Sequence, residues 1–277
     1  MHADCHIHMV LDGYNWRQSI ARHLIAPDKA LIRDVLSRYQ ALGYTYLRDG
    51  GDRWGVGALA RKTASEYGIC YRTPLAPLCL QGHYGSFIGK TYANIKEYAQ
   101  LVAEQKAQGA DFIKIMISGL MDFDHFGVLT EDGLAPAMIG ELIHIAHEEG
   151  LAVMAHANGA RTVEAAASLG LDSVEHGAYL DNDALSAMEE NGTVWVPTLS
   201  TIANLRGTNR FCEASVEKIL ESAFINIENY RGLIAPGTDA GAWAVPHGID
   251  TELALLSQLG VSDMRIAQGI EAIKSKF

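Results

Sequence analysis

Strand-like and helix-like segments alternate along the whole chain, and this alternation limits the fold more than any other feature of the sequence. Eight short runs rich in β-branched and apolar residues are separated by longer segments with helical periodicity. Such alternation favours a parallel sheet with right-handed crossovers. The predicted strands are residues 3–9, 44–49, 69–77, 111–117, 151–157, 172–176, 193–198 and 233–239.

Eight units in 277 residues correspond to about 35 residues each, the size of one strand–helix repeat. The sequence therefore predicts an α/β fold in which a single domain, residues 1–277, forms a closed (β/α)8 barrel of the TIM type. An open doubly wound sheet is the rival, and it requires a glycine-rich phosphate loop after its first strand. The glycine-rich stretch 50–57 follows the second strand and does not match GxGxxG, so the barrel is favoured.

Local signals support the predicted boundaries. Asp181 stands where a helix N-cap belongs, and Gly192 closes the helix that follows it. Five glycines fall one to three residues before a predicted strand, as C-cap glycines do, and we interpret them as structural: Gly43, Gly68, Gly109, Gly150 and Gly170.

Composition excludes several classes of function. Asp and Glu outnumber Lys and Arg by 33 to 22, which gives a net charge of −11 and argues against a nucleic-acid partner. No apolar run is long enough to span a membrane, and the first ten residues lack the pattern of a secretory signal. Four scattered cysteines fit a reducing compartment. We expect a cytoplasmic protein that acts on a small-molecule substrate.

The first predicted strand carries His6 and His8, which point to the same face because they lie two residues apart. Both imidazoles can therefore reach one ion, although an HxH pair alone is a weak signal. In the fourth strand, Lys114 points into the barrel while Ile113 and Ile115 face the helices. This lysine either reaches the barrel mouth or a carboxylate partner, or it is a metal ligand whose amine has lost its proton or is modified.

Three further polar residues end predicted strands: His156 the fifth, His176 the sixth and Asp239 the eighth. Barrel enzymes keep their active sites at the carboxyl ends of the strands. Each residue alone is as compatible with a core or loop role as with function. Taken together, these residues indicate a metal site, because five of the eight strands carry His, Lys or Asp at the end where barrel enzymes keep their sites.

This set of residues resembles the amidohydrolase superfamily of metal-dependent hydrolases. The surrounding motifs GYTYLRDGG, GADFIKIMISG, AHANG, EHGAYLD, VPTLS and GTDAG are most similar to the branch that contains imidazolonepropionases and Xaa-Pro or Xaa-Arg dipeptidases. The resemblance extends from His6 to about Ser275. It implies cleavage of a C–N bond in a small amide, dipeptide or cyclic amide by a metal-bridged hydroxide.

The resemblance also implies the roles of individual residues. Lys114 would be carboxylated and would bridge two divalent metal ions, and zinc is the expected metal. His6, His8 and Asp239 would complete the first site, and His156 and His176 the second. Two nearby cations lower the pKa of water towards neutrality, and Asp239 would act as general base and then as general acid.

Candidate substrate contacts lie in the loops beyond the strands. His83 follows the third strand and His247 the eighth, and each is either a substrate contact or an ordinary polar loop residue. Tyr179 is a further candidate, with core packing as its alternative. Asn158 stands where dipeptidase-like members carry a tyrosine that meets substrate. Either of two loop arginines can clamp a carboxylate or remain solvated: Arg206 and Arg210.

Two questions stay open at this stage. Relatives of this branch carry a small β-sandwich, and we expect it to be absent here. A truncated chain, a homo-oligomer or a minimal barrel would each explain that absence. The same metals also support a deaminase, a lactonase or a phosphoester hydrolase. A non-catalytic binder that retains its metals is the alternative outside enzymes.

Overall fold

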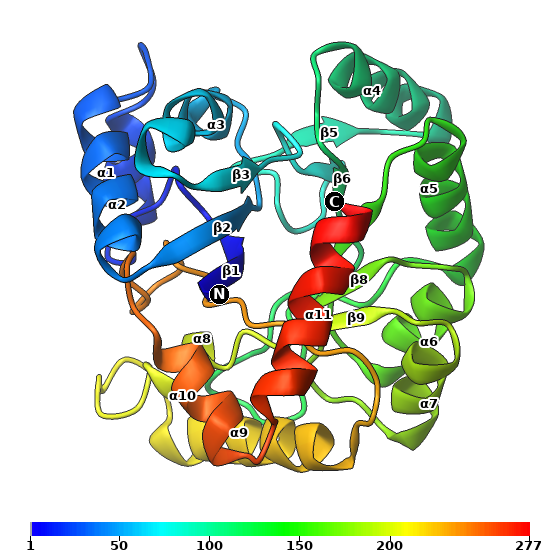
Figure 1. The fold of residues 1–277 in the computed structure, drawn as a ribbon. Coiled ribbons are helices and arrows are strands. Elements are labelled where there is room, and N and C mark those ends of the chain that lie inside the picture. The colour runs from blue at the N-terminus through cyan, green and yellow to red at the C-terminus, as the bar shows by residue number, and fades with distance from the viewer. Residues whose placement is uncertain (1) are drawn as a thin grey trace.

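The strands of the protein pair in parallel throughout the part of the chain that the computed structural model describes, residues 2–277 (Figure 1). These strands are β1 (His2–Ile7), β2 (Tyr44–Asp49), β3 (Cys70–Arg72), β4 (Leu78–Leu80), β5 (Lys90–Tyr92), β6 (Ile113–Met116), β7 (Val153–Ala157), β8 (Ser173–His176) and β9 (Val194–Val196).

Helices surround the strands, as the alternating pattern predicts. They are α1 (Trp16–Ala21), α2 (Lys29–Ala41), α3 (Val56–Ala64), the 3-10 turn η1 (Ser65–Tyr67), α4 (Ile95–Ala107), α5 (Pro136–Glu148), α6 (Ala160–Ser168), α7 (Asn182–Glu190), α8 (Ser200–Ala203), α9 (Glu213–Asn229), α10 (Thr251–Gln258) and α11 (Asp263–Lys276). None of the helices in residues 2–277 is long and apolar enough to cross a membrane.

The strands form two sheets, β1-β2-β3 and β5-β4-β6-β7-β8-β9, which the chain joins into a barrel. The segment 233–240 lies between β9 and β1. Ala235 N–H donates to the carbonyl of Trp195 (2.9 Å), and Cys5 N–H donates to the carbonyl of Pro236 (2.8 Å). The parallel strands, with helices on their outer side, confirm the predicted α/β barrel.

Two predicted strands differ from the structure. The predicted strand 69–77 is broken into β3 and β4, because Pro74 and Pro77 lie between them and a proline cannot donate to a strand ladder. The predicted strand 233–239 makes only isolated bridges, between Ile234 and Trp195 and between Ala240 and Ile7. Pro236 and Gly237 interrupt regular pairing there. The short strand β5 was not expected from the sequence.

The predicted helix boundaries agree with the structure. The Asp181 side chain accepts a hydrogen bond from Ala184 N–H (3.0 Å) at the start of α7, and Gly192 follows that helix with φ +63°. All five glycines predicted at C-caps have positive φ, between 69° and 90°: Gly43, Gly68, Gly109, Gly150 and Gly170.

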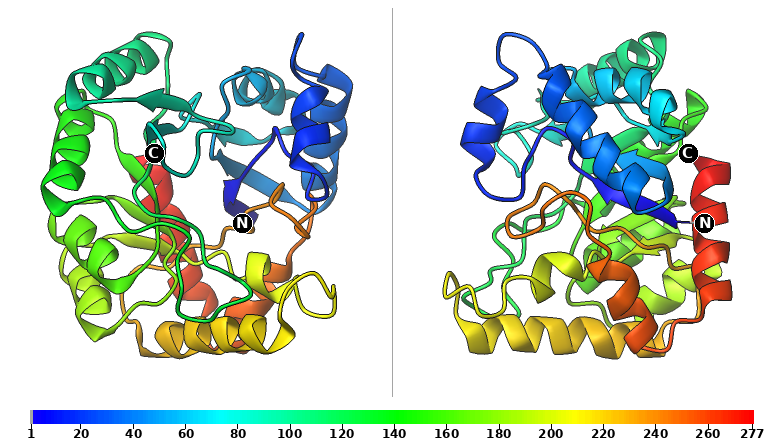
Figure 2. Two further views of the ribbon diagram at one scale, coloured as in Figure 1. Left: turned by 180° about the vertical axis from the view of Figure 1, so that it is seen from behind. Right: turned by 60° about the vertical axis from the view of Figure 1, so that its left-hand side comes forward.

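The two ends of the barrel are covered differently. The last helix, α11, lies across the end where the strands begin, and long loops cross the opposite end (Figures 1 and 2). Gly269 allows α11 to approach closely, since a Cβ atom there would lie 1.9 Å from the carbonyl oxygen of Ile234. The end where the strands finish is therefore the open one, and it holds the candidate site.

Candidate metal centre

All six predicted metal ligands line one cavity at the carboxyl ends of the strands. The cavity has a volume of about 640 Å³, in the range of pockets for small molecules. β1, β6, β7 and β8 each contribute a residue, and the positions just after β1 and in the segment 233–240 add the others. The lining ligands are His6, His8, Lys114, His156, His176 and Asp239.

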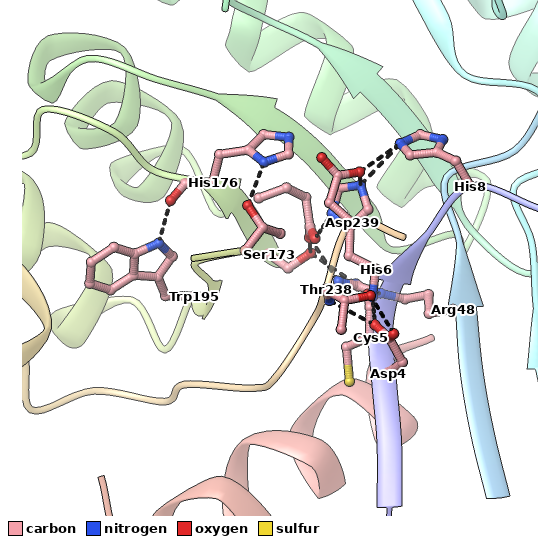
Figure 3. A network of polar contacts seen from close by, with 12 residues as sticks. Asp4, Cys5, His6, His8, Arg48, Ser173, His176, Trp195, Thr238 and Asp239 are labelled. Atoms are coloured by element: carbon pink, nitrogen blue, oxygen red, sulfur yellow. Dashed lines mark hydrogen bonds and ion pairs between the residues drawn. The ribbon is translucent and has the colours of Figure 1, made fainter. Parts of the chain in front are cut away.

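His6, His8 and Asp239 lie within reach of a common ion. Their ligand atoms are within 4.8 Å of one another, and all three residues are buried. Asp239 Oδ1 is 3.5 Å from His6 Nε2 and 3.2 Å from His8 Nε2. Figure 3 shows the three side chains turned toward one another. Imidazole nitrogens with a carboxylate oxygen are a usual donor set for zinc.

His156 and His176 form a second pair beside this cluster. Their ring centroids are 4.6 Å apart, and the ring of His176 is 5.1 Å from that of His6. His176 Nδ1 shares a hydrogen bond with Thr198 Oγ1 (2.7 Å). Burial lowers the pKa of His6 to about 4 and that of His156 to about 3, helped by the charge of Lys114. These imidazoles are therefore neutral at pH 7 and retain a lone pair for a metal.

Lys114 is buried in the barrel, and its Nζ has no hydrogen-bond partner among the described residues. Burial lowers the pKa of this amine to about 8. The charge of Arg48 also lowers that pKa, whereas the charges of Glu175 and Asp239 raise it. An unpaired amine in such a position is costly for the fold. Its surroundings fit a role as a ligand after modification.

Asp239 is suited to accept a proton. Burial acts to raise the pKa of its carboxyl group, but the neighbouring His6, His8 and Lys114 outweigh burial and hold that pKa below its ordinary value. The carboxyl group is therefore ionised at neutral pH. Asp239 and His176 both lie in the left-handed region, with φ of 57° and 70°, which non-glycine residues adopt rarely.

Sequence reasoning missed the residues that hold His6 in place. The Glu175 carboxylate lies 2.7 Å from His6 Nδ1 and 2.7 Å from Arg48 Nη2, and Ser173 Oγ donates to it (2.6 Å). Arg48 also donates to the carbonyl of Cys5 (2.7 Å), so the ion pair is anchored to β1. Arg48 in β2 and Glu175 in β8, charged residues inside predicted strands, were the available signal.

Comparisons with known proteins bear on the fold of the chain. The search of family models found no match. Ochratoxinase of Aspergillus niger is 25% identical over 281 aligned positions, which cover 84% of this chain and 55% of that protein. The chain thus spans about half the length of the curated relatives it matches.

Solved structures give the fold. A Xaa-Pro dipeptidase superposes with a TM-score of 0.79 at 21% identity, over 99% of this chain and 75% of that chain. A structure described as an amidohydrolase gives 0.74 at 20% identity, over 98% and 74%. The A. niger ochratoxinase structure gives 0.72 at 22% identity, over 99% and 69%. The chain has the amidohydrolase fold. The resemblance indicated by its motifs is confirmed at the level of the fold.

The four residues predicted as substrate contacts are not among those that line this cavity, and their role stays a prediction: His83, Asn158, Tyr179 and His247. Each is engaged elsewhere. Asn158 Nδ2 donates to the carbonyl of Gly119 (3.0 Å), and His247 Nε2 is 2.9 Å from the carbonyl oxygen of Leu11. His83 lies 3.4 Å from Glu131. The fourth residue packs its ring against Phe126, with centroids 5.6 Å apart: Tyr179.

Aromatic side chains form much of the cavity wall. Except for Trp16 at the start of α1, they come from loops that periodicity does not describe, so the sequence offered no pattern by which to find them. The ring of Tyr84 lies 4.7 Å from that of His156, which connects the aromatic lining to the ligands. The aromatic lining residues are Tyr14, Trp16, Tyr84, Phe87, Phe123, Phe211 and Trp243.

Proposed function

We propose that the protein is a metal-dependent hydrolase that cleaves a C–N bond in a small amide, dipeptide or cyclic amide. One observation carries this proposal. His6, His8 and Asp239 converge within 4.8 Å beside the two other histidines. The cavity at this point also receives the Lys114 amine, which has no hydrogen-bond partner in residues 2–277. A barrel core built only for stability would contain Val, Ile and Leu at these positions.

The residues present fit two divalent metal ions, with zinc as the expected metal. His6, His8 and Asp239 would hold one ion, and His156 and His176 the other. Lys114 would bridge both after its Nζ adds to carbon dioxide, a step that forms an N–C bond and releases a proton. When bound, such ions polarise a scissile carbonyl and make water a stronger nucleophile at neutral pH.

The chain's own residues would carry the proton through the reaction. In hydrolysis, water adds to the carbonyl carbon, the C–N bond breaks, and a carboxylic acid and an amine are released. Asp239 takes the proton from the attacking water and gives it to the leaving nitrogen. Its depressed pKa leaves it ionised at the start, and its position 3.2 Å from His8 Nε2 holds the carboxylate at the base of the cavity.

The relatives support this type of substrate. A Xaa-Pro dipeptidase, an amidohydrolase and ochratoxinase are all similar to the chain in fold, and ochratoxinase also in sequence. By its name, the first cuts dipeptides. We propose that this chain cleaves the same type of bond, an amide C–N bond.

Metal analysis of protein never exposed to chelator tests the proposal. We expect about two divalent ions per chain and hydrolysis of dipeptides or N-acyl amino acids in preference to lactones and aryl phosphates. Lys114→Ala should lose most activity and one metal. The exposed Lys106, which pairs with Glu149, provides the control variant Lys106→Ala. Much less than one ion per chain, or a Lys114→Ala variant with unchanged metal content, would refute the proposed centre.

A further inference from the structure

One cationic side chain, Arg210, lies in the upper wall of the cavity with its guanidinium over an aromatic ring. Its Cζ is 4.0 Å from the ring centroid of Trp243 and 5.3 Å from that of Phe211. No carboxylate among residues 2–277 forms an ion pair with it. Stacking of this kind holds a guanidinium in place and leaves its edge free to donate hydrogen bonds.

The other charged groups of the cavity are accounted for. Lys114 lies at the base with the metal ligands. Asp122 also lines the wall, but its Oδ2 pairs with His125 Nδ1 (2.9 Å) and its Oδ1 accepts from the N–H of Asp124 (2.9 Å). The second loop arginine, Arg206, is outside the lining and donates to the carbonyl of Ala203 (3.3 Å). Arg210 is thus a charged residue of the cavity wall that has no ion-pair partner within residues 2–277.

Aromatic rings connect the mouth to the ligands on the side formed by the loops after β1 and β4. Trp16 and Phe87 meet edge to face (5.4 Å), Phe87 lies 5.9 Å from Tyr84, and Tyr84 reaches His156. The second wall contains Phe211 and Trp243 under Arg210. Such surfaces bind planar apolar groups, since aromatic pairs gain from stacking beyond the burial of their area.

We infer that Arg210, held by Trp243, is a specificity-determining residue that binds a carboxylate on the substrate. The substrate class is then an amide with a free carboxylate near the scissile bond and an aromatic group that fills the cavity. The substrate class in this inference rests on the proposed function, hydrolysis of an amide.

The test compares two compounds that differ only in charge, N-benzoylphenylalanine and its primary amide. Arg210→Met keeps an apolar stem over Trp243 and removes the charge. Arg17→Met is the matched control, because Arg17 also lies over a tryptophan ring, Trp16 (4.3 Å), but is not part of the cavity wall. Turnover is measured with zinc-loaded protein, and binding is measured by calorimetry with metal-free protein, so that one readout does not depend on activity.

We expect Arg210→Met to lower kcat/KM and affinity for the acid by about tenfold or more, because a charge-assisted bidentate contact is lost. The amide should change by less than about twofold, as should both compounds with Arg17→Met. Equal affinity of the metal-free wild type for acid and amide, or equal losses for both with Arg210→Met, would overturn the inference. If neither compound is cleaved but the acid still binds selectively, the proposed hydrolysis of this class is contradicted. The carboxylate-binding role of Arg210 is then still supported.

Discussion

Glu175 and His6 form a fully buried hydrogen bond that connects the proposed metal ligands to the barrel core. Glu175 Oε2 lies 2.7 Å from His6 Nδ1, and Glu175 Oε1 lies 2.7 Å from Arg48 Nη2 (Figure 3 shows His6, Arg48 and Ser173 from this network). Burial alone would raise the pKa of Glu175, but Arg48 and His6 outweigh burial and lower that pKa to about 2. The carboxylate is therefore an acceptor for His6 Nδ1–H, which leaves Nε2 free for a metal.

Glu175→Gln should weaken metal binding about 10- to 100-fold, because the amide is a poorer acceptor for His6 Nδ1–H and no longer fixes its tautomer. Competition with a chromophoric chelator measures the dissociation constant. Glu221→Gln, on the exposed side of α9, is the control. An unchanged metal affinity for Glu175→Gln, with folding intact by circular dichroism, would show that the pair supports only the core.

Lys114→Met should stabilise the metal-free protein while it weakens metal binding. Methionine has a similar length and removes an amine that is buried without a hydrogen-bond partner in residues 2–277. We expect the free energy of unfolding of the chelated protein to rise by about 1–3 kcal/mol. Urea denaturation of both proteins in excess chelator measures it. A less stable metal-free variant would mean that the Lys114 amine has favourable partners in the folded state.

Glu252 should make the stability of the protein depend on pH. This buried residue accepts hydrogen bonds from the N–H groups of Leu199 and Ser200, yet burial outweighs them and raises its pKa to about 8 from the ordinary 4.5. The folded state therefore binds the proton more tightly than the unfolded state. The contribution of Glu252 is fully present below about pH 4.5 and is lost as the pH rises to about 8.

Glu252→Gln keeps an acceptor of the same size and removes the titration. We therefore expect its free energy of unfolding to fall less than that of the wild type between pH 5 and pH 8. Denaturation of chelated protein at both pH values, with Glu221→Gln as the control, measures the difference. The same slope in Glu252→Gln and wild type would contradict the raised pKa.

Gly269→Ala should destabilise the protein by about 2 kcal/mol or more, although alanine is the better helix former by about 1 kcal/mol. The new methyl group would meet the carbonyl oxygen of Ile234 at 1.9 Å and push α11 off the barrel. Gly140→Ala in α5 is the matched control, since its Cβ would meet only the Leu169 side chain at 3.4 Å or more. Thermal unfolding compares the two, and equal melting temperatures would show that α11 can shift freely.

Much of the fold could be predicted because periodicity and capping act locally. The spacing of Ile32, Val35, Leu36 and Tyr39 matches the buried face of α2, and Asp181 caps α7. The predictions failed where regular pairing does not exist. Pairing in the segment 233–240 depends on contacts with β9 and β1, far away in the sequence, and these contacts leave no local pattern.

The convergence of the proposed ligands was predictable for a different reason: parallel strands in a barrel end at the same edge, so polar residues at strand ends must converge. The cavity wall was not predictable from the sequence, because most of its aromatic residues lie in loops whose conformation depends on tertiary contacts. Asn158 illustrates the limit. It stands two residues after His156, where dipeptidase-like proteins carry a tyrosine, and its amide donates to the backbone of the loop after β6, a contact that no sequence pattern predicts.

The left-handed backbone at His176 and Asp239 implies a conflict between folding stability and function in this barrel. Each such conformation costs about 1–3 kcal/mol for a non-glycine residue. A glycine at either position would relieve that cost and would at the same time delete a ligand side chain. Selection for thermal robustness alone would therefore erode the metal centre first, and consensus or directed-evolution variants of this protein should be screened for metal content as well as for melting temperature.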